Sequence, residues 1–375
     1  AKTLAARCHD VTVALQNKSV GDFDNLTAIG RAVRLALHLR GCPAVPYELL
    51  KQVANYLLNI NPTELRDTVY LLGEAEFVRL DTEGQTIRSV VPTVPHYEDL
   101  FAGAGQLATT RKLTEAEQLT VLILDRLARA PTPRSTIYEF GAERKLVDRM
   151  LSVGSQAGYV LSRRRRGKDL LLSPVYFPEN MDQFADVAAA HGSSRVRRVL
   201  NLISRNQGWP LSLAQSSRQI GEESLDDEDL KVIVGLADGG ISPTPMIQTG
   251  HAGCIHFIFS PKPGIARISP IKRPIFEAAM ALVAAVRQGQ LLPKEHRIRS
   301  PRALLTALRD RKRLRANTES LEQYRQLVSL RVGHVEPLWL TPRSAAVRTK
   351  SEARTRCQVT TTLGRSWRIQ GAIGA

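Results

Sequence analysis

The sequence predicts a mainly helical α+β fold that consists of three to four similar modules in tandem. Four segments each open with apolar residues at helical spacing, which indicates an amphipathic helix at the start of each. These helices begin at intervals of 87, 82 and 80 residues, near Leu26, Leu113, Arg195 and Ile275. Pro and Gly cluster over residues 92–110, 174–194 and 260–274, and such clusters punctuate domains. Because the segments share a plan but not a sequence, we interpret the interval as a structural repeat.

The first module, residues 1–95, is expected to contain three helices followed by a β-hairpin. Its second helix covers Pro46–Leu58, and Asn61-Pro62-Thr63-Glu64 supplies the third with a capping box and a first-turn proline. Two extended runs follow, Phe77–Leu80 and Thr86–Val91. We expect the next stretch, which includes Gly103-Ala104-Gly105, to be a linker.

The second module, residues 111–178, repeats this plan. The elements expected after its first helix are two helices and two strands, Pro133–Phe140, Gly141–Gly154, Tyr159–Leu161 and Leu170–Leu172. Three helices closed by a hairpin, with an arginine cluster at the hairpin tip, resemble a winged-helix DNA-binding domain over about 60 residues. The resemblance implies that the third helix enters a DNA groove and that the wing contacts the backbone.

The third and fourth modules, residues 194–260 and 270–375, fit the plan more loosely. The third is expected to contain a helix and two strands, Leu225–Leu236, Thr244–Gln248 and Gly253–Phe259. The fourth is expected to contain helices over residues 274–288, 301–315 and 319–332, a short run over 338–340, and a hairpin of Gln358–Thr361 with Trp367–Gln370. The whole chain thus resembles a tandem winged-helix (helix-turn-helix) DNA-binding protein, without matching a specific family.

The positive charge of the chain is confined to its last third. The 375 residues include 52 Lys and Arg against 36 Asp and Glu, with a formal net charge of +16 and a pI near 10.1. The first 260 residues sum to zero, whereas residues 261–375 carry 23 basic and 7 acidic residues. A basic excess in one region favours contact with a polyanion, most often nucleic acid. A solvated tail, or a docking face for an acidic partner, would have the same composition.

In the second module, the third helix and the hairpin tip hold the cations that we expect to contact DNA. They are Arg144, Lys145 and Arg149 on the helix, and Arg163, Arg164, Arg165, Arg166 and Lys168 at the tip. Guanidinium groups bind phosphates through two donors and enter narrow minor grooves. Adjacent arginines repel one another, and a polyanion removes that repulsion. A solvated hairpin tip is the alternative interpretation.

The fourth module is the most basic region. Its candidate DNA contacts are Arg297, Arg299, Arg302, Arg309, Arg311, Lys312, Arg313, Arg315, Arg348, Lys350, Arg354, Arg356, Arg365 and Arg368. Cations at a helix C-terminus also complement the helix dipole, which accounts for part of the pattern. Ser, Thr and Gly separate the last of these residues, as in an arm that becomes ordered on DNA. Aromatic residues are nearly absent among them, which favours contact with the duplex backbone over stacking on single strands.

The first and third modules are acidic where the second is basic. The acidic residues near their third helices are Glu64, Asp67, Glu74 and Glu76 in the first module, and Glu222, Glu223 and Asp226–Asp229 in the third. Phosphates would repel such helices. We therefore expect these modules to contact a partner protein or a second copy of the chain.

Motifs of known catalytic centres are absent from the sequence, so we expect no enzymatic activity, no cofactor and no metal. The chain lacks a GxxxxGK[ST] loop, a GxSxG turn and an HExxH helix. His251, Cys254 and His256 form the densest group of metal-ligand residues, but no second pair completes a tetrahedral site. The run Asp226–Asp229 is typical of a first helical turn rather than of a nuclease site. Gln288-Gly289-Gln290 is only a weak counterpart of the paired glutamines in winged-helix alkylpurine DNA glycosylases.

These observations predict a non-enzymatic protein that binds double-stranded DNA in the cytoplasm, associated with the nucleoid in a bacterial cell. It would act as a transcriptional regulator, or as the DNA-binding subunit of a replication, defence or chromosome-maintenance complex. No apolar stretch approaches the roughly 18 residues of a membrane span, so no membrane contact is expected. An assembly subunit that docks an acidic protein and a DNA-processing enzyme, such as a glycosylase or nuclease, are the alternatives. RNA is not excluded as the polyanion, because phosphate contacts alone do not distinguish it.

Overall fold

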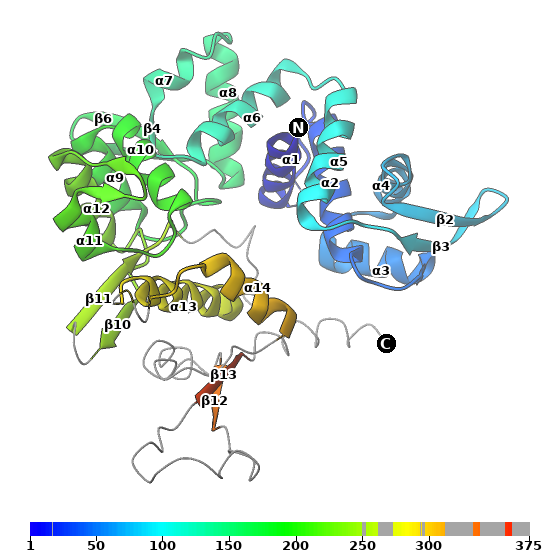
Figure 1. The fold of residues 1–375 in the computed structure, drawn as a ribbon. Coiled ribbons are helices and arrows are strands. Elements are labelled where there is room, and N and C mark those ends of the chain that lie inside the picture. Colours follow the sequence, from blue (N-terminus) through cyan, green and yellow to red (C-terminus); the bar gives the residue numbers. More distant parts are fainter. Residues whose placement is uncertain are drawn as a thin grey trace, which may run out of the picture. The chain divides into compact units, whose positions relative to one another are not determined.

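The computed structural model describes residues 1–16, 18–249, 253–261, 273–292, 294, 297–311, 333–337 and 357–361. These residues form a mainly helical α+β fold with small antiparallel sheets, in agreement with the predicted fold class. The chain divides into two compact units, the first of residues 1–197 and the second beginning at residue 198. Figure 1 colours both units along the chain. Within the described ranges, no helix is long and apolar enough to cross a lipid bilayer.

The first part of unit 1 consists of helices around a three-stranded sheet. Its elements are α1 (Lys2–Leu15), α2 (Asp24–Leu39), β1 (Val45–Pro46), α3 (Tyr47–Leu58), α4 (Pro62–Glu74), β2 (Val78–Glu83), β3 (Thr86–Pro92) and α5 (Tyr97–Thr110). The strand order is β1-β3-β2, and all pairs are antiparallel. Apolar side chains of α2, α3 and α4 meet those of the sheet in one core, which includes Leu50, Leu65 and Val90. The expected helices and hairpin of this region are confirmed.

The stretch that we expected to be a linker before residue 110 is instead the helix α5. Leu100 and Ala104, one helical turn apart, are buried, and α5 packs against α1 and α2 (Figure 1). A Cβ atom at Gly103 would lie 2.8 Å from Cζ of Phe77, so the glycine allows the helix to approach the core. Composition misled the prediction, because this glycine serves close packing rather than flexibility.

The second part of unit 1 repeats the order of elements from α2 to α5 and has no counterpart of α1. Its elements are α6 (Glu115–Leu127), β4 (Thr132–Pro133), α7 (Arg134–Tyr138), α8 (Arg144–Ala157), β5 (Leu161–Arg165), β6 (Lys168–Leu172) and α9 (Met181–His191), followed by α10 (Ser193–Arg205), in which the division between the units falls. The sheet has the strand order β4-β6-β5. The expected hairpin is therefore present and joins a third, two-residue strand at its β6 edge.

The Pro- and Gly-rich interval over residues 174–194 also contains a helix that the sequence did not lead us to expect. Helix α9 buries Phe184, Ala185 and Ala188 and packs against β5 and β6. The ring centroids of Phe177 and Phe184 are 4.7 Å apart in an edge-to-face arrangement, so the turn before α9 belongs to the same core. One face of the arginine-rich hairpin is consequently covered by a helix.

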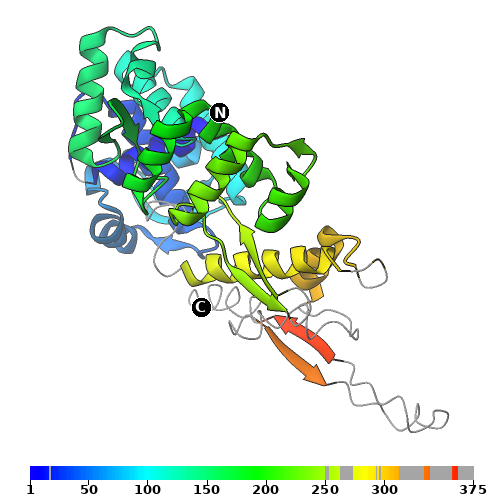
Figure 2. The ribbon, with the colours of Figure 1, turned by 90° about the vertical axis from the view of Figure 1, so that its left-hand side faces the viewer.

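Unit 2 contains a third sheet and the helix that covers it. Its elements after α10 are β7 (Trp209–Pro210), α11 (Leu211–Ser217), β8 (Gln219–Ile220), β9 (Glu223–Ser224), α12 (Asp227–Asp238), β10 (Met246–Thr249), β11 (Gly253–Ile258), α13 (Arg273–Gln290), α14 (Pro301–Arg311), β12 (Gly333–Pro337) and β13 (Cys357–Thr361). The strand order of the sheet is β10-β11-β7. Phe257, Met280 and Ala284 share a core, which places α13 along this sheet (Figure 2).

A helix, a two-residue strand, two helices and a hairpin recur three times among the described residues, and in the third case the strand pair β8–β9 is inserted between the two helices. In each case the short strand pairs with the last strand of the hairpin. Each short strand ends in proline, and that proline is the N-cap of the following helix, at Pro46, Pro133 and Pro210. Proline suits a short strand at the edge of a sheet, because such a strand does not need every backbone N–H for pairing. It also suits the residue before a helix, because its fixed φ angle is compatible with the extended conformation there.

In the last part of the chain, the structure shows a strand pair that the sequence did not lead us to expect. Strand β13 forms where we expected a strand, but it pairs with β12, and Val335 lies opposite Val359. The expected partner, Trp367–Gln370, lies outside the described residues, as do the run 338–340 and the helix over 319–332. Helix α14 begins at Pro301 as predicted, and α13 begins at Arg273, one residue before its predicted start.

Candidate nucleic-acid interface

Helix α8 is the described element that carries the first group of expected DNA contacts. Val147, Met150 and Gly154 are buried and turn one face of the helix toward α6. A Cβ atom at Gly154 would lie 2.6 Å from Val160 Cγ2, so glycine lets the hairpin approach the helix. The opposite face presents the polar residues of α8 to solvent.

The three cations of α8 differ in their surroundings. Lys145 is exposed. The Arg144 guanidinium lies 4.8 Å from the centre of the Tyr138 ring, which is a cation–π distance, and the residue is exposed. Arg149 instead forms an ion pair with Asp22, which precedes α2. The structure therefore places Arg144 and Lys145 at the outer start of the helix and engages Arg149 internally.

A polar triad fixes the start of α8 on α7. The Tyr138 hydroxyl donates a hydrogen bond to Asp148 Oδ1 over 2.6 Å, and Arg134 Nη2 contacts the same oxygen at 2.9 Å. The hydrogen bond from Tyr138, followed by the one from Arg134, lowers the pKa of the Asp148 carboxyl below its ordinary value of 3.8. Asp148 is therefore ionised at neutral pH and neutralises the charge of Arg134. As a result, Arg134 adds little to the positive electrostatic potential at the surface.

The tip of the β5–β6 hairpin is a two-residue turn. Residues Arg165 and Lys168 pair across the hairpin, and Arg166 and Gly167 between them both have positive φ angles, 49° and 76°. Two consecutive positive φ angles are the geometry of a type I′ turn, whose twist matches that of the strands. An arginine in the left-handed region is uncommon, and the turn holds its side chain at the outermost point of the hairpin.

Acidic residues of α9 engage two of the four tip arginines. Arg163 Nε and Arg165 Nη2 both lie 2.9 Å from Asp182 Oδ1, and Arg165 Nε lies 3.3 Å from Asp186 Oδ1. Asp182 and Asp186 are one helical turn apart, so both reach the same strand. The repulsion among the arginines, which we expected a polyanion to relieve, is thus relieved in part by the chain itself. Because these pairs are partly exposed, each contributes only about 0–1 kcal/mol and is screened by salt.

Arg164 and Arg166 are the tip arginines that face away from α9. Arg164 is 78% exposed, and its closest carboxylate, that of Asp169, is 4.0 Å away. Lys168 is exposed as well, although its Nζ donates a hydrogen bond to the Ala189 carbonyl at the end of α9. Five cations therefore stand against three carboxylates at the tip, and the excess lies on its outer face.

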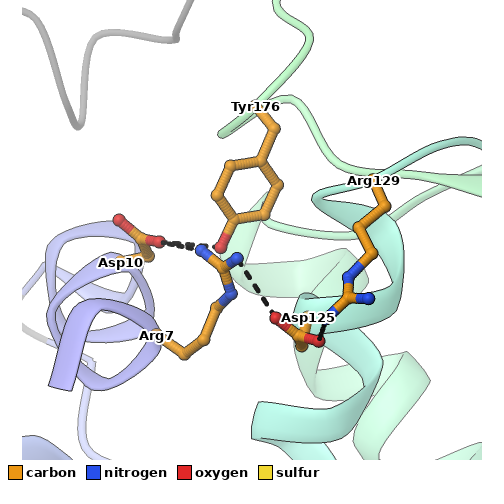
Figure 3. A network of polar contacts seen from close by, with 5 residues as sticks. All are labelled: Arg7, Asp10, Asp125, Arg129 and Tyr176. Atoms are coloured by element: carbon orange, nitrogen blue, oxygen red, sulfur yellow. Dashed lines mark hydrogen bonds and ion pairs between the residues drawn. The ribbon is translucent and has the colours of Figure 1, made fainter. Parts of the chain in front are cut away.

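Buried polar contacts hold the two parts of unit 1 together (Figure 3). Asp10 of α1 is 1% exposed; it accepts a hydrogen bond from the Tyr176 hydroxyl at 2.7 Å and pairs with Arg7 Nη1 at 3.2 Å. Arg7 also reaches Asp125 of α6 at 3.3 Å, and Asp125 in turn pairs with Arg129. Since Tyr176 follows β6, this network ties the base of the hairpin to α1.

A second contact of this kind joins α2 to α6. Glu117 is fully buried; its Oε1 accepts the backbone N–H of Leu26 at 2.7 Å, and its Oε2 accepts that of Thr114 at 2.8 Å. One carboxylate thereby caps the first turns of two helices. Sequence reasoning missed these contacts, because nothing in a linear sequence marks partners that lie 91 or more residues apart.

In unit 2, the described candidates lie on and before α14. Arg297, Arg299, Arg302, Arg309 and Arg311 are all exposed. Arg297 Nε donates to the Leu292 carbonyl over 3.2 Å, and Arg309 Nε lies 2.8 Å from Asp310 Oδ1. The other candidates, Lys312, Arg313, Arg315, Arg348, Lys350, Arg354, Arg356, Arg365 and Arg368, lie outside the described residues.

Internal contacts account for much of the acidity in the first and third modules. Glu64 completes the capping box of α4 and pairs with Arg31 at 3.0 Å. Asp229 completes the capping box of α12, is fully buried, and forms an ion pair with Arg198. The run Asp226–Asp229 thus lies at a helix start, as expected, although α12 begins at Asp227 rather than at Leu225, with Asp226 as the N-cap.

The residues considered as metal ligands do not converge in the described part of the chain. Cys254 and His256 are both exposed on β11, and His251 lies outside the described residues. No cluster of three or more His, Cys, Asp or Glu side chains suited to a metal occurs within the described ranges. No model of a known protein family matches the chain, and no curated protein is similar to it in sequence.

Proposed function

We propose that the chain is a non-enzymatic DNA-binding protein built of tandem winged-helix modules, with the boundaries 1–95, 111–178 and 194–260 and a basic fourth region over 270–375. The recurring order of helices and strands supports the first three modules. In each, the last helix before the hairpin has the position of a recognition helix.

The observation that carries the proposal is the outward cluster of cations on neighbouring elements of the second module. Arg144 and Lys145 begin α8, Arg164 and Arg166 lie at the outer face of the hairpin, and α8 packs against β5. A groove-binding helix with a cationic wing beside it matches the shape and charge of duplex DNA. The α9 carboxylates neutralise the inner arginines, so we assign the phosphate contacts to the outer pair.

The test removes the two outer cations and keeps the fold. The variant Arg164→Gln/Arg166→Asn preserves the turn, because Asn tolerates positive φ. We expect weaker binding to every duplex sequence and a salt dependence, d log K/d log [salt], that is shallower by about 1.8, or 0.9 for each lost phosphate contact. Fluorescence anisotropy of a labelled duplex at several KCl concentrations measures both.

The matched control is Arg79→Gln/Arg88→Gln, which removes two exposed cations from the hairpin of the first module. It changes the net charge by the same amount, and we expect it to leave affinity and salt dependence unchanged. If both double variants weakened binding equally, the effect would depend on net charge alone. That outcome would contradict the assignment of the phosphate contacts to Arg164 and Arg166. Unchanged affinity of the first variant would do the same.

We also propose that the first module contacts a second copy of the chain. Three large apolar side chains of α3 are exposed, Leu49 at 51%, Tyr56 at 79% and Leu57 at 64%. Neighbouring exposed apolar residues on one helix are typical of an interaction surface. Such a dimer would present two second modules to DNA, as transcriptional regulators and other DNA-binding subunits do.

A further inference from the structure

A cavity of about 500 Å³ lies in unit 1, and none of the cations assigned to DNA lines it. Its floor is one face of α2, and its walls are the end of α1 with the segment after it and the turn between α3 and α4. A volume of this size matches the range of small-molecule sites, about 300–1,000 Å³. The charged residues that line it are Lys18, Asp24, Arg31, Arg34 and Glu64.

Four of these five charges are already engaged or stand at a helix start. Arg31 Nη1 pairs with Glu64 Oε1 at 3.0 Å, and the other oxygen of Glu64 accepts the Asn61 N–H. Lys18 Nζ donates to the Gln156 carbonyl over 2.9 Å. Asp24 lies in the first turn of α2, where the helix dipole stabilises a carboxylate.

Arg34 is the exception. Its side chain is partly buried and lines the cavity. Burial lowers the pKa of its guanidinium, and no carboxylate among the described residues forms an ion pair with it. The neighbouring Arg31 Nε is buried and has no hydrogen-bond partner among the described atoms. Guanidinium groups in such surroundings are stabilised when an anion supplies the missing acceptors.

We propose that this cavity binds a small organic anion whose carboxylate or phosphate group pairs with Arg34. The polar remainder of the ligand faces the side chains of Asn55 and Asn59, which also line the cavity. Amide groups both donate and accept hydrogen bonds, so they suit hydroxyl or heterocyclic groups. The site is independent of the proposed DNA contacts, since it shares none of their residues.

The experiment follows Arg34 directly in the full chain. Arginine Nε–Hε resonances are recorded by NMR on the ¹⁵N-arginine-labelled, deuterated protein, and the Arg34 resonance is identified by its loss in Arg34→Gln. Inorganic phosphate and malonate serve as probes, with chloride at equal ionic strength as the reference. We expect the Arg34 resonance to shift, and the shift to reach saturation, with phosphate, with malonate or with both. The probe that gives this shift indicates whether the ligand carries a phosphate or a carboxylate group. No saturable shift beyond that of chloride overturns the proposal.

Affinity and stability provide the second readout. By calorimetry, Arg34→Gln should bind the effective probe about 10- to 100-fold more weakly, because a hydrogen bond to a charged group is lost. Arg66→Gln, an exposed cation of α4, should bind like the wild type. Without ligand, Arg34→Gln should melt at the same or a higher temperature, since it removes an uncompensated charge. A marked drop in the melting temperature of Arg34→Gln would show that Arg34 has a structural role instead. A shift of the Arg34 resonance with duplex DNA, and with neither anion, would assign the cavity to the DNA-binding surface. Either result overturns the proposal.

Discussion

Asp10 and Glu117 are buried carboxylates, and each is satisfied by groups from a distant part of the chain. Asp10 contacts Arg7 of its own helix and Tyr176 beyond β6, whereas Glu117 accepts two backbone N–H groups. An ionised carboxylate in a core is costly unless it is paired and hydrogen-bonded. Asp10 therefore couples α1 to the segment after β6, and Glu117 couples α2 to α6.

Removal of one hydroxyl tests this coupling. Tyr176→Phe deletes the donor that lies 2.7 Å from buried Asp10 and leaves the ring in place. We expect unit 1 to lose about 1–3 kcal/mol of its free energy of unfolding. The buried carboxylate of Asp10 then loses a hydrogen-bond donor, and water does not reach it to take the place of that donor. Urea unfolding followed by circular dichroism measures the change. Tyr70→Phe, at a tyrosine that is 41% exposed, is the control and should leave the midpoint where it was. Equal midpoints for both variants would contradict the role of Tyr176.

At the scale of the element, local signals predicted the ends of helices well. The capping box of α4 is present as expected, with Glu64 N donating to Asn61 Oδ1 over 2.8 Å and Asn61 N donating to Glu64 Oε2 over 3.3 Å. Such caps are formed by residues three positions apart, so the sequence contains both partners. By contrast, α5 and α9 were not expected, because their stretches are rich in glycine or border on prolines. Each is stabilised by packing against elements elsewhere in the chain.

Two glycines in helices allow the contribution of packing to be measured. A Cβ atom at Gly30 of α2 would lie 2.5 Å from the Cys8 carbonyl oxygen of α1 and closer still to Thr12, whereas one at Gly73 of α4 would meet nothing within 4 Å. We expect Gly30→Ala to destabilise unit 1 by about 1–3 kcal/mol, because α1 and α2 must move apart. Gly73→Ala should stabilise it by up to about 1 kcal/mol through helix propensity. Thermal unfolding of both variants checks the signs, and a stabilised Gly30→Ala would show that the two helices are not in close contact.

The hairpin of the second module shows why charge in the sequence is not the same as charge at the surface. The four arginines are consecutive, but a strand directs alternate side chains to opposite faces. Arg163 and Arg165 meet Asp182 and Asp186 of α9, while Arg164 points away from them. The alternation of side chains along the strand could be predicted from the sequence. The position of the acidic helix α9 against one face of the hairpin could not.

At the scale of the whole molecule, the repeat is the feature that sequence and structure share. The interval of about 80 residues between helices corresponds to a recurring order of elements, and prolines at the short strands mark it at Pro46, Pro133 and Pro210. The prolines could have been used as a sequence signal, since each combines a strand end with a helix start. Pro293 follows at a similar interval and lies outside the described residues.

Self-association through the first module is tested on the whole chain. Tyr56→Ser/Leu57→Ser replaces two exposed apolar side chains of α3, and we expect it to weaken dimerisation at least 10-fold, because burial of each such side chain contributes about 1.5–3 kcal/mol. Sedimentation velocity over a concentration series measures this. Leu122→Ser, at a leucine of α6 that is 52% exposed, is the control and should sediment like the wild type. A wild-type chain that is monomeric throughout would rule out the proposed dimer.

The sequence by itself determined the fold class, the interval of the repeat, the hairpins of the first two modules and the residues that cap α4, because periodicity, turn residues and caps act between neighbours along the chain. Only the tertiary structure decided that 97–110 and 181–191 are helices, that the arginine hairpin has a neutralised and an open face, and that Arg34 lines a cavity without an ion-pair partner among the described residues. Those features depend on residues that are distant in the sequence and adjacent in space. Burial and charge compensation are properties of that proximity, and composition does not contain them.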